Sequence, residues 1–429
     1  MKKFLALIIA LVMALSLVAC GEQKQPETPD VPDDGGDQQQ TATIKVGFIT
    51  LHDENSTYDL NFINAAKEAI ANLGLTENDY ILKTNIEEGQ KCYDTAAELA
   101  DAGCNIIFAD SFGHESYMIQ AAKDFPNVQF CHSTGTRAHT EGLSNYHNAF
   151  ASIYEGRYLA GIAAGLKLNA MIEAGDIKAE EAKMGYVGAF TYAEVVSGYT
   201  SFYLGAKSVC PTVTMDVTFT GSWYDETLEK EGAEKLIQGG CKLISQHADS
   251  LGAPTACENA GVPNVSYNGS TQAACPNTYI ISSRINWAPY YEYAIKAVMD
   301  GTAIDTDWTG TLATNSVVLT DLNTTVAAEG TAEAIAAATE KLEKGEIHVF
   351  DCSTFTTKAD DTMNAFKVDY LKVDADGHIT SYMADVDTDQ AYAGDTEVVH
   401  DGYFAESEKR SAPYFDLEID GITRLDTKM

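Results

Sequence analysis

Apolar residues along the chain switch repeatedly between strand-like runs and helix-like spacing from Ile44 onward. The run "TIKVGFIT" has the β-branched and apolar content of a buried strand. The segment "NFINAAKEAIANLG" then predicts a helix that ends at Gly74 and has one apolar face, formed by Ile63, Ala66, Ile70 and Leu73. One strand followed by one helix is thus the first repeating unit.

The same unit recurs up to about residue 150. Three more strands are predicted in "YILKTNI", "NIIFAD" and "VQFCHS", with helices in "KCYDTAAELADAG" and "HESYMIQAAKDF". Strands joined through helices predict a parallel, doubly wound sheet, because parallel strands need a crossover connection. We therefore assign a first lobe with four strands to residues 44–150.

A long amphipathic helix in "SIYEGRYLAGIAAGL" precedes a second series of alternating elements. This series runs through "MGYVGAF", "EVVSGYTSFYLGAK", "TVTMDVTFTG", "ETLEKEGAEKLIQGG", "KLISQHA", "TACENAG", "VPNVSYN" and "YIISSRIN". We assign a second lobe to residues 151–286 and a return segment that completes both lobes to residues 287–355. The length of 429 residues agrees with two lobes, since single cores seldom exceed roughly 250 to 300 residues. The predicted fold class is α/β.

Residues 356–429 form a C-terminal extension with a weaker pattern, which we expect to be mostly β or irregular. The segment "VDADGHIT" predicts a hairpin with Asp-Gly at its turn. The stretch from "TSYMADVDTDQ" onward is acidic, bears aromatic residues and has no clear period. We expect a small β element that lies on one lobe, and the sequence assigns it no function.

The N-terminal segment predicts export and a lipid anchor. "MKKFLALIIALVMALSLVAC" has two lysines, an apolar run too short for a membrane span, and small residues before Cys20. We interpret residues 1–20 as a lipoprotein signal peptide with Cys20 as the lipid attachment site, and an ordinary signal peptide is the alternative. Residues 21–43 have no aromatic and almost no apolar residue, which predicts a disordered tether. The expected location is the extracytoplasmic face of the cell membrane.

The net charge and the cysteines indicate which macromolecular partners, disulfide bonds and metal sites to expect. The formal net charge of -35 repels phosphate backbones, so nucleic acid is not expected as a partner. The cysteines after Cys20 lie in a compartment that permits disulfides. Pairing of Cys210 with Cys241 and of Cys257 with Cys275 stays open, and free buried thiols are equally expected. No pair has the spacing of a zinc site.

Polar and aromatic residues stand where the predicted strands end. The strand "KLISQHADS" ends with His247 and Asp249, and other strands end with Ser111, Phe112, Ser133, Thr134, Trp223 and Asn268. Ligands of open α/β sheets bind at the carboxyl ends of the strands, so two such sheets predict a binding cleft between the lobes. The alternative is that these residues only form turns and helix caps. Phe112 and Trp223 favour the cleft, since a loop gains little by exposing large rings.

Signatures of catalysis are missing from the sequence. "HESYM" lacks the second histidine of a metalloprotease helix, because Met118 holds its place. No GxxxxGK[ST], GxGxxG or GxSxG motif occurs. The acidic run from Asp385 to Gln390 lacks the glycine and the glutamate that a calcium loop needs. We therefore expect no enzyme activity, no cofactor and no metal.

Several longer segments match one known family in order and spacing. They are "GFIT" with "STYD", "FADSFGHE", "YEGRYLAGIAAGL", "GYVGAF", "EVVSGYTSFYLGAKSV", "TGSWYDETLEKEGAEKLIQGGCKLISQHADS", "INWAPYY" and "KGEIHVFDCSTF". Together they resemble the basic membrane protein family of substrate-binding lipoproteins, over roughly residues 44–355. The resemblance implies a two-lobed, hinged receptor of the type I periplasmic-binding fold that delivers a purine base or purine nucleoside to an ABC permease and its ATPase. We expect a monomer, because a permease must engage both lobes of one receptor.

The same resemblance implies which residues hold the ligand. Tyr58 and Trp223 would stack on the two faces of a purine ring, one from each lobe. Asp249 would accept from a ring N–H or an exocyclic amine. Asn268 and His247 can both donate and accept at other edges of the ring.

The chain departs from nucleoside-binding members at two residues. Those members hold the ribose with a lysine near the segment "YIISSRIN", where this chain has Arg284 and Trp287. Trp287 in "NWAPYY" resembles the branch associated with free bases such as adenine, so we favour a nucleobase without excluding a nucleoside. Alternatively, Trp287 packs at the base of the helix that follows it.

Other functions stay open in the sequence. Aromatic rings with Asp and Asn also suit a sugar or another small polar solute. A ligand-sensing lipoprotein that docks on a membrane kinase or chemoreceptor has the same architecture. An enzyme such as a nucleoside hydrolase needs a cluster of aspartates for calcium, which Asp53 and Asp59 in "LHDENSTYD" do not form.

Overall fold

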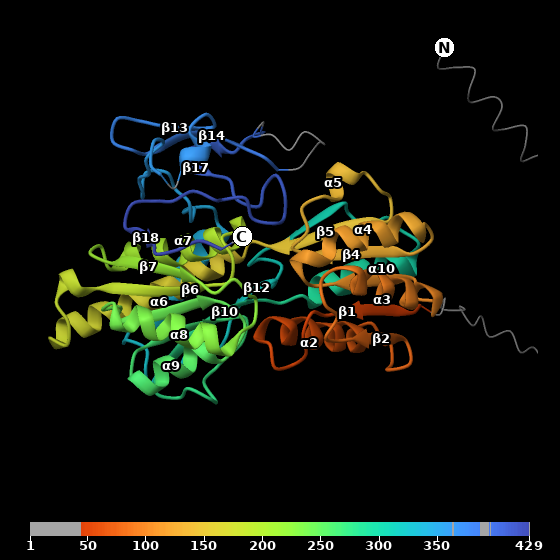
Figure 1. Ribbon diagram of the computed structural model, residues 1–429, viewed down its shortest axis with the longest axis horizontal. Helices are drawn as coiled ribbons and strands as arrows, with labels where there is room; N and C mark the ends of the chain where they lie inside the picture. The colour runs from red at the N-terminus through yellow and green to blue at the C-terminus, as the bar shows by residue number, and fades with distance from the viewer. Residues whose placement is uncertain (1–43, 363, 387–393, 395, 429) are drawn as a thin grey trace, which may run out of the picture. The chain divides into compact units, whose positions relative to one another are not determined.

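Two mainly parallel β-sheets with helices on both faces make up most of the chain (Figure 1). The computed structural model describes residues 44–362, 364–386, 394 and 396–428. The predicted signal peptide, Cys20 and the predicted tether lie outside these residues. No helix in the described residues is long and apolar enough to cross a membrane.

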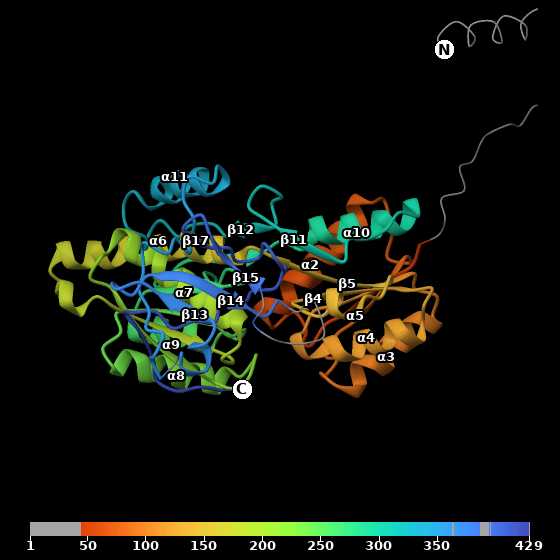
Figure 2. The ribbon, with the colours of Figure 1, turned by 90° about the horizontal axis from the view of Figure 1, so that it is seen from above.

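The first sheet contains parallel strands in the order β11-β5-β4-β3-β1-β2. The strands are β1 (Val46–Ile49), β2 (Tyr80–Lys83), β3 (Ile106–Ala109), β4 (Gln129–Ser133), β5 (Tyr146–Ala151) and β11 (Asp307–Gly310). On one face lie α2 (Thr57–Asn72) and α10 (Ala288–Asp300), and on the other lie α3 (Gln90–Asp101) and α4 (Glu115–Asp124) (Figure 2). Two short helices follow strands, η1 (Phe112–His114) and α5 (Ala138–Glu141).

The expected set of four strands for this sheet was too small. Strand β5 follows the fourth predicted strand, and β11 returns from much later in the chain. Strand β5 has the sequence "YHNAFA", in which His147 and Asn148 are polar but buried. Because these polar residues interrupt the apolar run, the sequence pattern did not predict this strand.

The second sheet has the order β12-β10-β9-β8-β6-β7-β18. The strands are β6 (Lys183–Gly188), β7 (Thr214–Phe219), β8 (Leu243–His247), β9 (Asn264–Tyr267), β10 (Tyr279–Ile285), β12 (Val317–Leu319) and β18 (Ile422–Arg424). Strand β12 runs antiparallel to β10, and the others pair in parallel. The helices are α6 (Ile153–Ala174), α7 (Ala193–Val209), α8 (Glu226–Gln238), α9 (Gly252–Ala260), η2 (Ala179–Glu181) and α11 (Thr331–Glu343).

Helices α6 and α7 pack unusually closely on one face of the second sheet. A Cβ atom on Gly161 of α6 would lie 2.0 Å from the carbonyl oxygen of Phe202, and one on Gly205 of α7 would lie 2.0 Å from that of Tyr158. The glycines of "LAGIAAGL" therefore let the two helix backbones approach each other. Helix α7 begins at Ala193, and Glu194 in its first turn borders the pocket described below.

The chain passes between the two sheets at more than one place. It does so from β5 into α6, from β10 into α10 and from β11 into β12. The backbone N–H of Ser152 donates to the carbonyl oxygen of Gly310 at 2.8 Å, so two of these connections lie side by side. Adjacent short connections of this kind are typical of a hinge.

The C-terminal residues form small antiparallel elements that pack on the lobe of the second sheet. They comprise η3 (Ala365–Lys367), β13 (Leu371–Val373), β14 (Ile379–Ala384), β15 (Thr396–Glu397), β16 (Val399–His400) and β17 (Tyr403–Phe404). The expected hairpin is present as β13 and β14, with Gly377 at φ 93° in its turn. Phe415 and Leu417 are fully buried in the core that includes α6 and α7.

The cysteines from Cys92 to Cys352 are all free and buried. Neither of the two pairings left open by the sequence is formed. Burial raises the pKa of the Cys241 thiol to about 12, so this sulfur is a packed apolar group.

Candidate functional site

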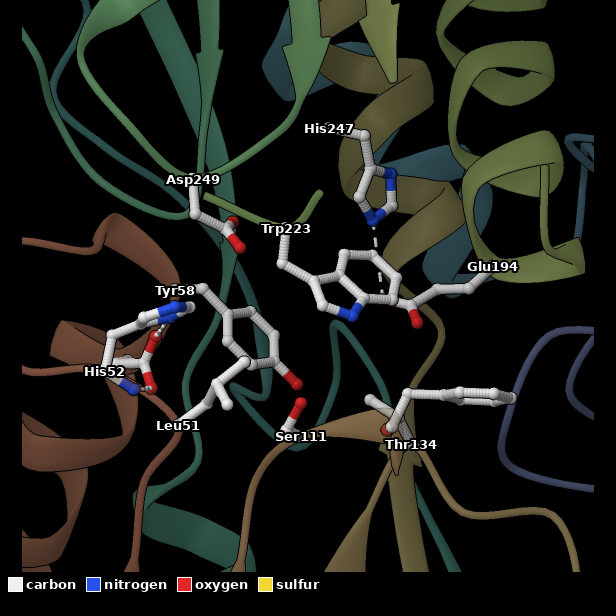
Figure 3. Close-up of a pocket in the computed structure, with 11 residues that line it drawn as sticks. Leu51, His52, Tyr58, Ser111, Thr134, Glu194, Trp223, His247 and Asp249 are labelled. Carbon is white, nitrogen blue, oxygen red and sulfur yellow. Dashed lines mark hydrogen bonds and ion pairs between the residues drawn. The ribbon is translucent and has the colours of Figure 1, made fainter. Parts of the chain in front are cut away.

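A pocket lies where the carboxyl ends of strands from both sheets meet (Figure 3). The space between its walls, counted together with the solvent-open part, is about 350 Å³. The lining residues are Leu51, His52, Tyr58, Asp59, Ser111, Phe112, Thr134, Glu194, Trp223, His247 and Asp249. These residues lie in the loops after β1, β3, β4 and β7, at the end of β8 and just after it, and in the first turns of α2 and α7.

Tyr58 is held rigidly on the side of the first sheet. Its hydroxyl donates to the carbonyl oxygen of Asp110 at 2.7 Å, and its ring packs on Phe62 with centroids 4.8 Å apart. It stands in the first turn of α2, which Ser56 caps by accepting from the N–H of Asp59. The ring therefore meets the pocket in a fixed orientation.

The carboxylate of Asp59 holds the loop between β1 and α2 in place through hydrogen bonds. It accepts from the backbone N–H of His52 at 2.8 Å and from the hydroxyl of Ser56 at 2.5 Å. Burial raises the pKa of Asp59, but hydrogen bonds from His52 and Ser56 outweigh burial and leave the pKa below its usual value. Asp59 is thus a negative charge at the pocket wall.

His247 ends β8 and contacts groups on both of its ring nitrogens. Its Nε2 lies 3.4 Å from Oε1 of Glu194, and its Nδ1 lies 3.4 Å from the hydroxyl of Tyr186. Burial, and then the charge of Arg157, lowers the pKa of His247 to about 4, so the ring is neutral at pH 7. A proton on Nε2 satisfies both contacts, because Nε2 then donates to Glu194 and Nδ1 accepts from Tyr186.

Asp249 points into the pocket from the loop after β8 (Figure 3). Burial raises its pKa well above the usual value, and the nearby Asp59, Glu229 and Glu194 add to the effect. Asn268 donates weakly to its Oδ1 at 3.5 Å. A carboxyl group that keeps its proton to higher pH can both donate to and accept from a ligand.

Aromatic rings from both sides border the pocket. Phe112, from the first sheet, stacks on Tyr192 of the second with centroids 5.0 Å apart. Trp223 packs edge-on against Phe190 at 5.1 Å and is tilted against Tyr192 at 6.1 Å. These rings offer flat apolar faces to a ligand.

The two sides also meet through hydrogen bonds beside the pocket. The backbone N–H of Thr57 in α2 donates to the carbonyl oxygen of Asp249 at 3.0 Å. The amide of Asn61 donates to Oδ1 of Asn268 at 3.4 Å. The pocket is therefore enclosed by contacts between residues that are far apart in the sequence.

Most of the predicted binding residues come together here. Tyr58, Phe112, Trp223, His247 and Asp249 line the pocket, whereas Asn268 is not among the lining residues and contacts Asp249. The structure places Trp287 elsewhere: it is 1% exposed in the core and stacks on Phe62 at 4.6 Å. Arg284, on β10, also lies outside the lining. Trp287 faces the core because it directly precedes α10, whose apolar face packs on the first sheet.

Glu194, like Leu51, His52 and Asp59, is a pocket residue that the sequence did not indicate. It stands in the first turn of α7, the helix that follows β6. The rule that ligands lie at strand ends applies to β6 as it does to β8, but the predicted strand "MGYVGAF" ends in apolar residues. Within the described residues, no group of three or more His, Cys, Asp or Glu side chains is arranged to hold a metal ion.

The sequence and the fold are similar to those of solute-binding proteins. Residues 48–351 match the family model for Bmp, described as ABC transporter substrate-binding protein PnrA-like. A purine-binding protein of Brucella abortus (strain 2308) is 33% identical over 62% of this chain and 72% of its own. A putative ABC transporter glucose-binding protein of Haloferax volcanii is 28% identical over 76% of this chain and 79% of its own. An ABC transporter solute-binding protein from Aeropyrum pernix K1 has the same fold, with a TM-score of 0.61, 18% identity, and coverage of 76% of this chain and 96% of its own.

Proposed function

Because the chain belongs to the Bmp family of ABC transporter substrate-binding proteins, we propose that it captures a purine base or purine nucleoside and delivers it to an ABC importer. The observation that supports this most is the pocket, in which aromatic rings and carboxyl groups from both sheets face one enclosed space. The similarity to a purine-binding protein points the same way.

Stacking supplies the part of the proposed binding energy that does not depend on which purine is bound. A purine ring placed between Tyr58 and Trp223 gains about 1 to 3 kcal/mol per stacking contact. The bond from the Tyr58 hydroxyl to Asp110 fixes one of these rings before the ligand arrives. Less conformational freedom is then lost on binding.

Polar groups discriminate between purines in this proposal. The carboxyl of Asp249 and the carboxylate of Glu194 accept from N–H groups on the ring edge. The neutral ring of His247 orients Glu194 through their 3.4 Å contact. A ligand without N–H groups leaves these buried acceptors unpaired, which is costly.

A free base is favoured over a nucleoside. No lysine or arginine stands among the lining residues, and Arg284 and Trp287 lie outside the pocket. The cationic group expected to hold a ribose is therefore not provided by the segment "YIISSRIN". Adenine is our first candidate.

We further propose that the receptor works as a monomer tethered to the outer face of the cell membrane through a lipid on Cys20. The sequence motif "LVAC" and the polar residues 21–43 support this part of the proposal. Labelling with a radioactive or clickable fatty acid tests it directly. Label should enter wild type and be lost from a Cys20→Ala variant.

Ligand identification and thermal shifts test the proposed function. We would denature the purified protein, identify any released molecule by absorbance and mass, and measure melting temperatures with purine bases, nucleosides and ribose. A ligand that binds only the folded state raises the melting temperature. A rise with adenine or hypoxanthine but not with their nucleosides indicates a base receptor. A rise with none of them contradicts the proposal.

A sugar is the second candidate, and the similarity to a putative glucose-binding protein favours it. Aromatic rings with carboxyl groups also suit a pyranose. D-glucose therefore belongs in the same panel. A shift with D-glucose and none with purines would replace the purine proposal with this one.

A further inference from the structure

Thr134 has a buried hydroxyl group at the pocket wall whose proton is not used by the protein. The residue is 3% exposed, and it lines the pocket from the loop after β4 (Figure 3). Its Oγ1 has no hydrogen-bond partner within the described part of the chain. Buried polar groups are nearly always paired, so an unpaired one that faces a binding pocket indicates a group meant for a ligand.

The other hydroxyl groups on this side of the pocket are already engaged. Ser111 donates to Oε1 of Glu88 at 2.6 Å, and Tyr58 donates to the carbonyl oxygen of Asp110 at 2.7 Å. Each hydroxyl has one proton to give. Thr134 is therefore the lining hydroxyl in the first lobe that can still donate to a ligand.

The backbone of Thr134 adopts a conformation that its side chain disfavours. Its φ of 69° lies in the left-handed region, which is a genuine outlier for a β-branched residue. Glycine adopts this region without steric cost. A threonine kept here indicates that its side chain is needed, since such strain gathers at ligand-binding positions.

Neighbouring groups hold the loop in this shape. The N–H of Thr134 donates to the carbonyl oxygen of Ala149 at 3.1 Å. Oε1 of the buried Glu115 accepts from the N–H groups of Thr136 at 2.7 Å and Arg137 at 2.9 Å. At Gly135 a Cβ atom would lie 2.0 Å from the amide nitrogen of Asn148, so no larger residue fits. The hydroxyl is thereby fixed before any ligand binds.

We propose that Thr134 is a specificity-determining residue that donates a hydrogen bond to an acceptor atom on the bound ligand. The acceptor is a ring nitrogen or carbonyl oxygen on the ligand edge that faces the first sheet. Asp249, across the pocket from Thr134, would meet another edge of the ligand (Figure 3). This inference rests on the proposed function, because it assumes an uncharged heterocycle in this pocket.

Three substitutions separate binding from folding. Thr134→Val keeps the shape and removes the hydroxyl, Thr134→Ser keeps the hydroxyl, and Thr134→Gly relieves the backbone and removes the side chain. Titration calorimetry with the tightest-binding purine of the panel should show a Kd about tenfold higher for Thr134→Val and near wild type for Thr134→Ser. Thr134→Gly should bind more weakly while its ligand-free melting temperature is no lower than wild type.

A ligand change tests the hydrogen bond itself. We would measure the same purine with each ring nitrogen in turn replaced by C–H. The analogue that lacks the acceptor should bind wild type about tenfold more weakly, yet bind wild type and Thr134→Val alike. If Thr134→Val binds the purine with wild-type affinity, the inference about Thr134 is wrong, but the proposed function still stands. A wild-type protein that binds no purine overturns the proposed function and this inference with it.

Discussion

Asp249 combines deep burial with several acidic neighbours, and in our proposal it is the main polar contact of the ligand. Substituting Asp249→Asn replaces one carboxyl oxygen with an NH2 group, which donates hydrogen bonds but cannot accept one. We expect the Kd of the preferred purine to rise about tenfold or more, because a buried N–H of the ligand loses its acceptor.

Calorimetric titration checks this expectation. Asp300→Asn is the matched control, because Asp300 lies at the exposed end of α10 and pairs with Lys296, far from the lining residues. Unchanged affinity in Asp249→Asn would remove this residue from the site.

Trp223 provides an optical test of where the ligand binds. The chain has three tryptophans, and Trp287 and Trp308 belong to the core of the first sheet. A purine that stacks on Trp223 should therefore quench its fluorescence and leave the emission of the other two unchanged. Trp223→Phe should lose the ligand-dependent signal, and Trp287→Phe should keep it. A signal that persists in Trp223→Phe would place the ligand elsewhere.

Residue by residue, the strand-end rule predicted much of the site but not all of it. It indicated Phe112, Trp223, His247 and Asp249, because each ends a buried strand or lies in the loop after one. It gave no reason to place Trp287 in the core, since the direction of a side chain after a strand depends on the helix that follows. Only the packed structure shows that Trp287 stacks on Phe62.

At the scale of elements, the spacing of apolar residues predicted the regular βα units. It did not predict strands that contain buried polar residues or that pair with distant segments. His147 in β5 contacts Gln129 and the carbonyl oxygen of Asp305, so its burial is compensated by contacts from two other segments. Strand β18 pairs in parallel with β7 from more than 200 residues away in sequence. No local pattern encodes either feature, because both depend on distant partners.

The segment after β17 carries a buried acid whose ionisation opposes folding. Glu406 accepts from the N–H groups of Tyr414 at 3.2 Å and Phe415 at 2.9 Å, and burial raises its pKa from 4.5 to about 7. Its contribution to stability is complete below the unfolded pKa and is lost as pH rises through about 7. The expected loss in the free energy of unfolding is about 3 kcal/mol.

Chemical denaturation at several pH values from 4.5 to 8 tests this point. The stability of wild type should fall more steeply with pH than that of Glu406→Gln. Glu408→Gln, a change in the same segment at a side chain that is 44% exposed, is the control for loss of one charge. Parallel curves for wild type and Glu406→Gln would mean that Glu406 titrates as an ordinary exposed acid.

For the whole molecule, charge restricts which solutes can enter. The formal net charge is -35, and the pocket lining contains Asp59, Glu194 and Asp249 but no lysine or arginine. A phosphate group would meet the charge of Asp59 in this low-dielectric space, and no lysine or arginine lines the pocket to offset that repulsion. If the pocket accepts adenosine, AMP should bind at least about tenfold more weakly, because it carries the same base and sugar with an added charge. Displacement of a bound purine by AMP at the concentration at which adenosine displaces it would contradict this account of the pocket.

The most direct test of purine capture between the two sheets is a crystal structure of the protein grown with the purine that gives the largest thermal shift. We predict electron density for the ring inside the pocket, stacked against Trp223, with Asp249 and Thr134 within hydrogen-bond distance of its edges. Density for the purine at another surface, or a ring that touches none of these residues, would contradict the proposal.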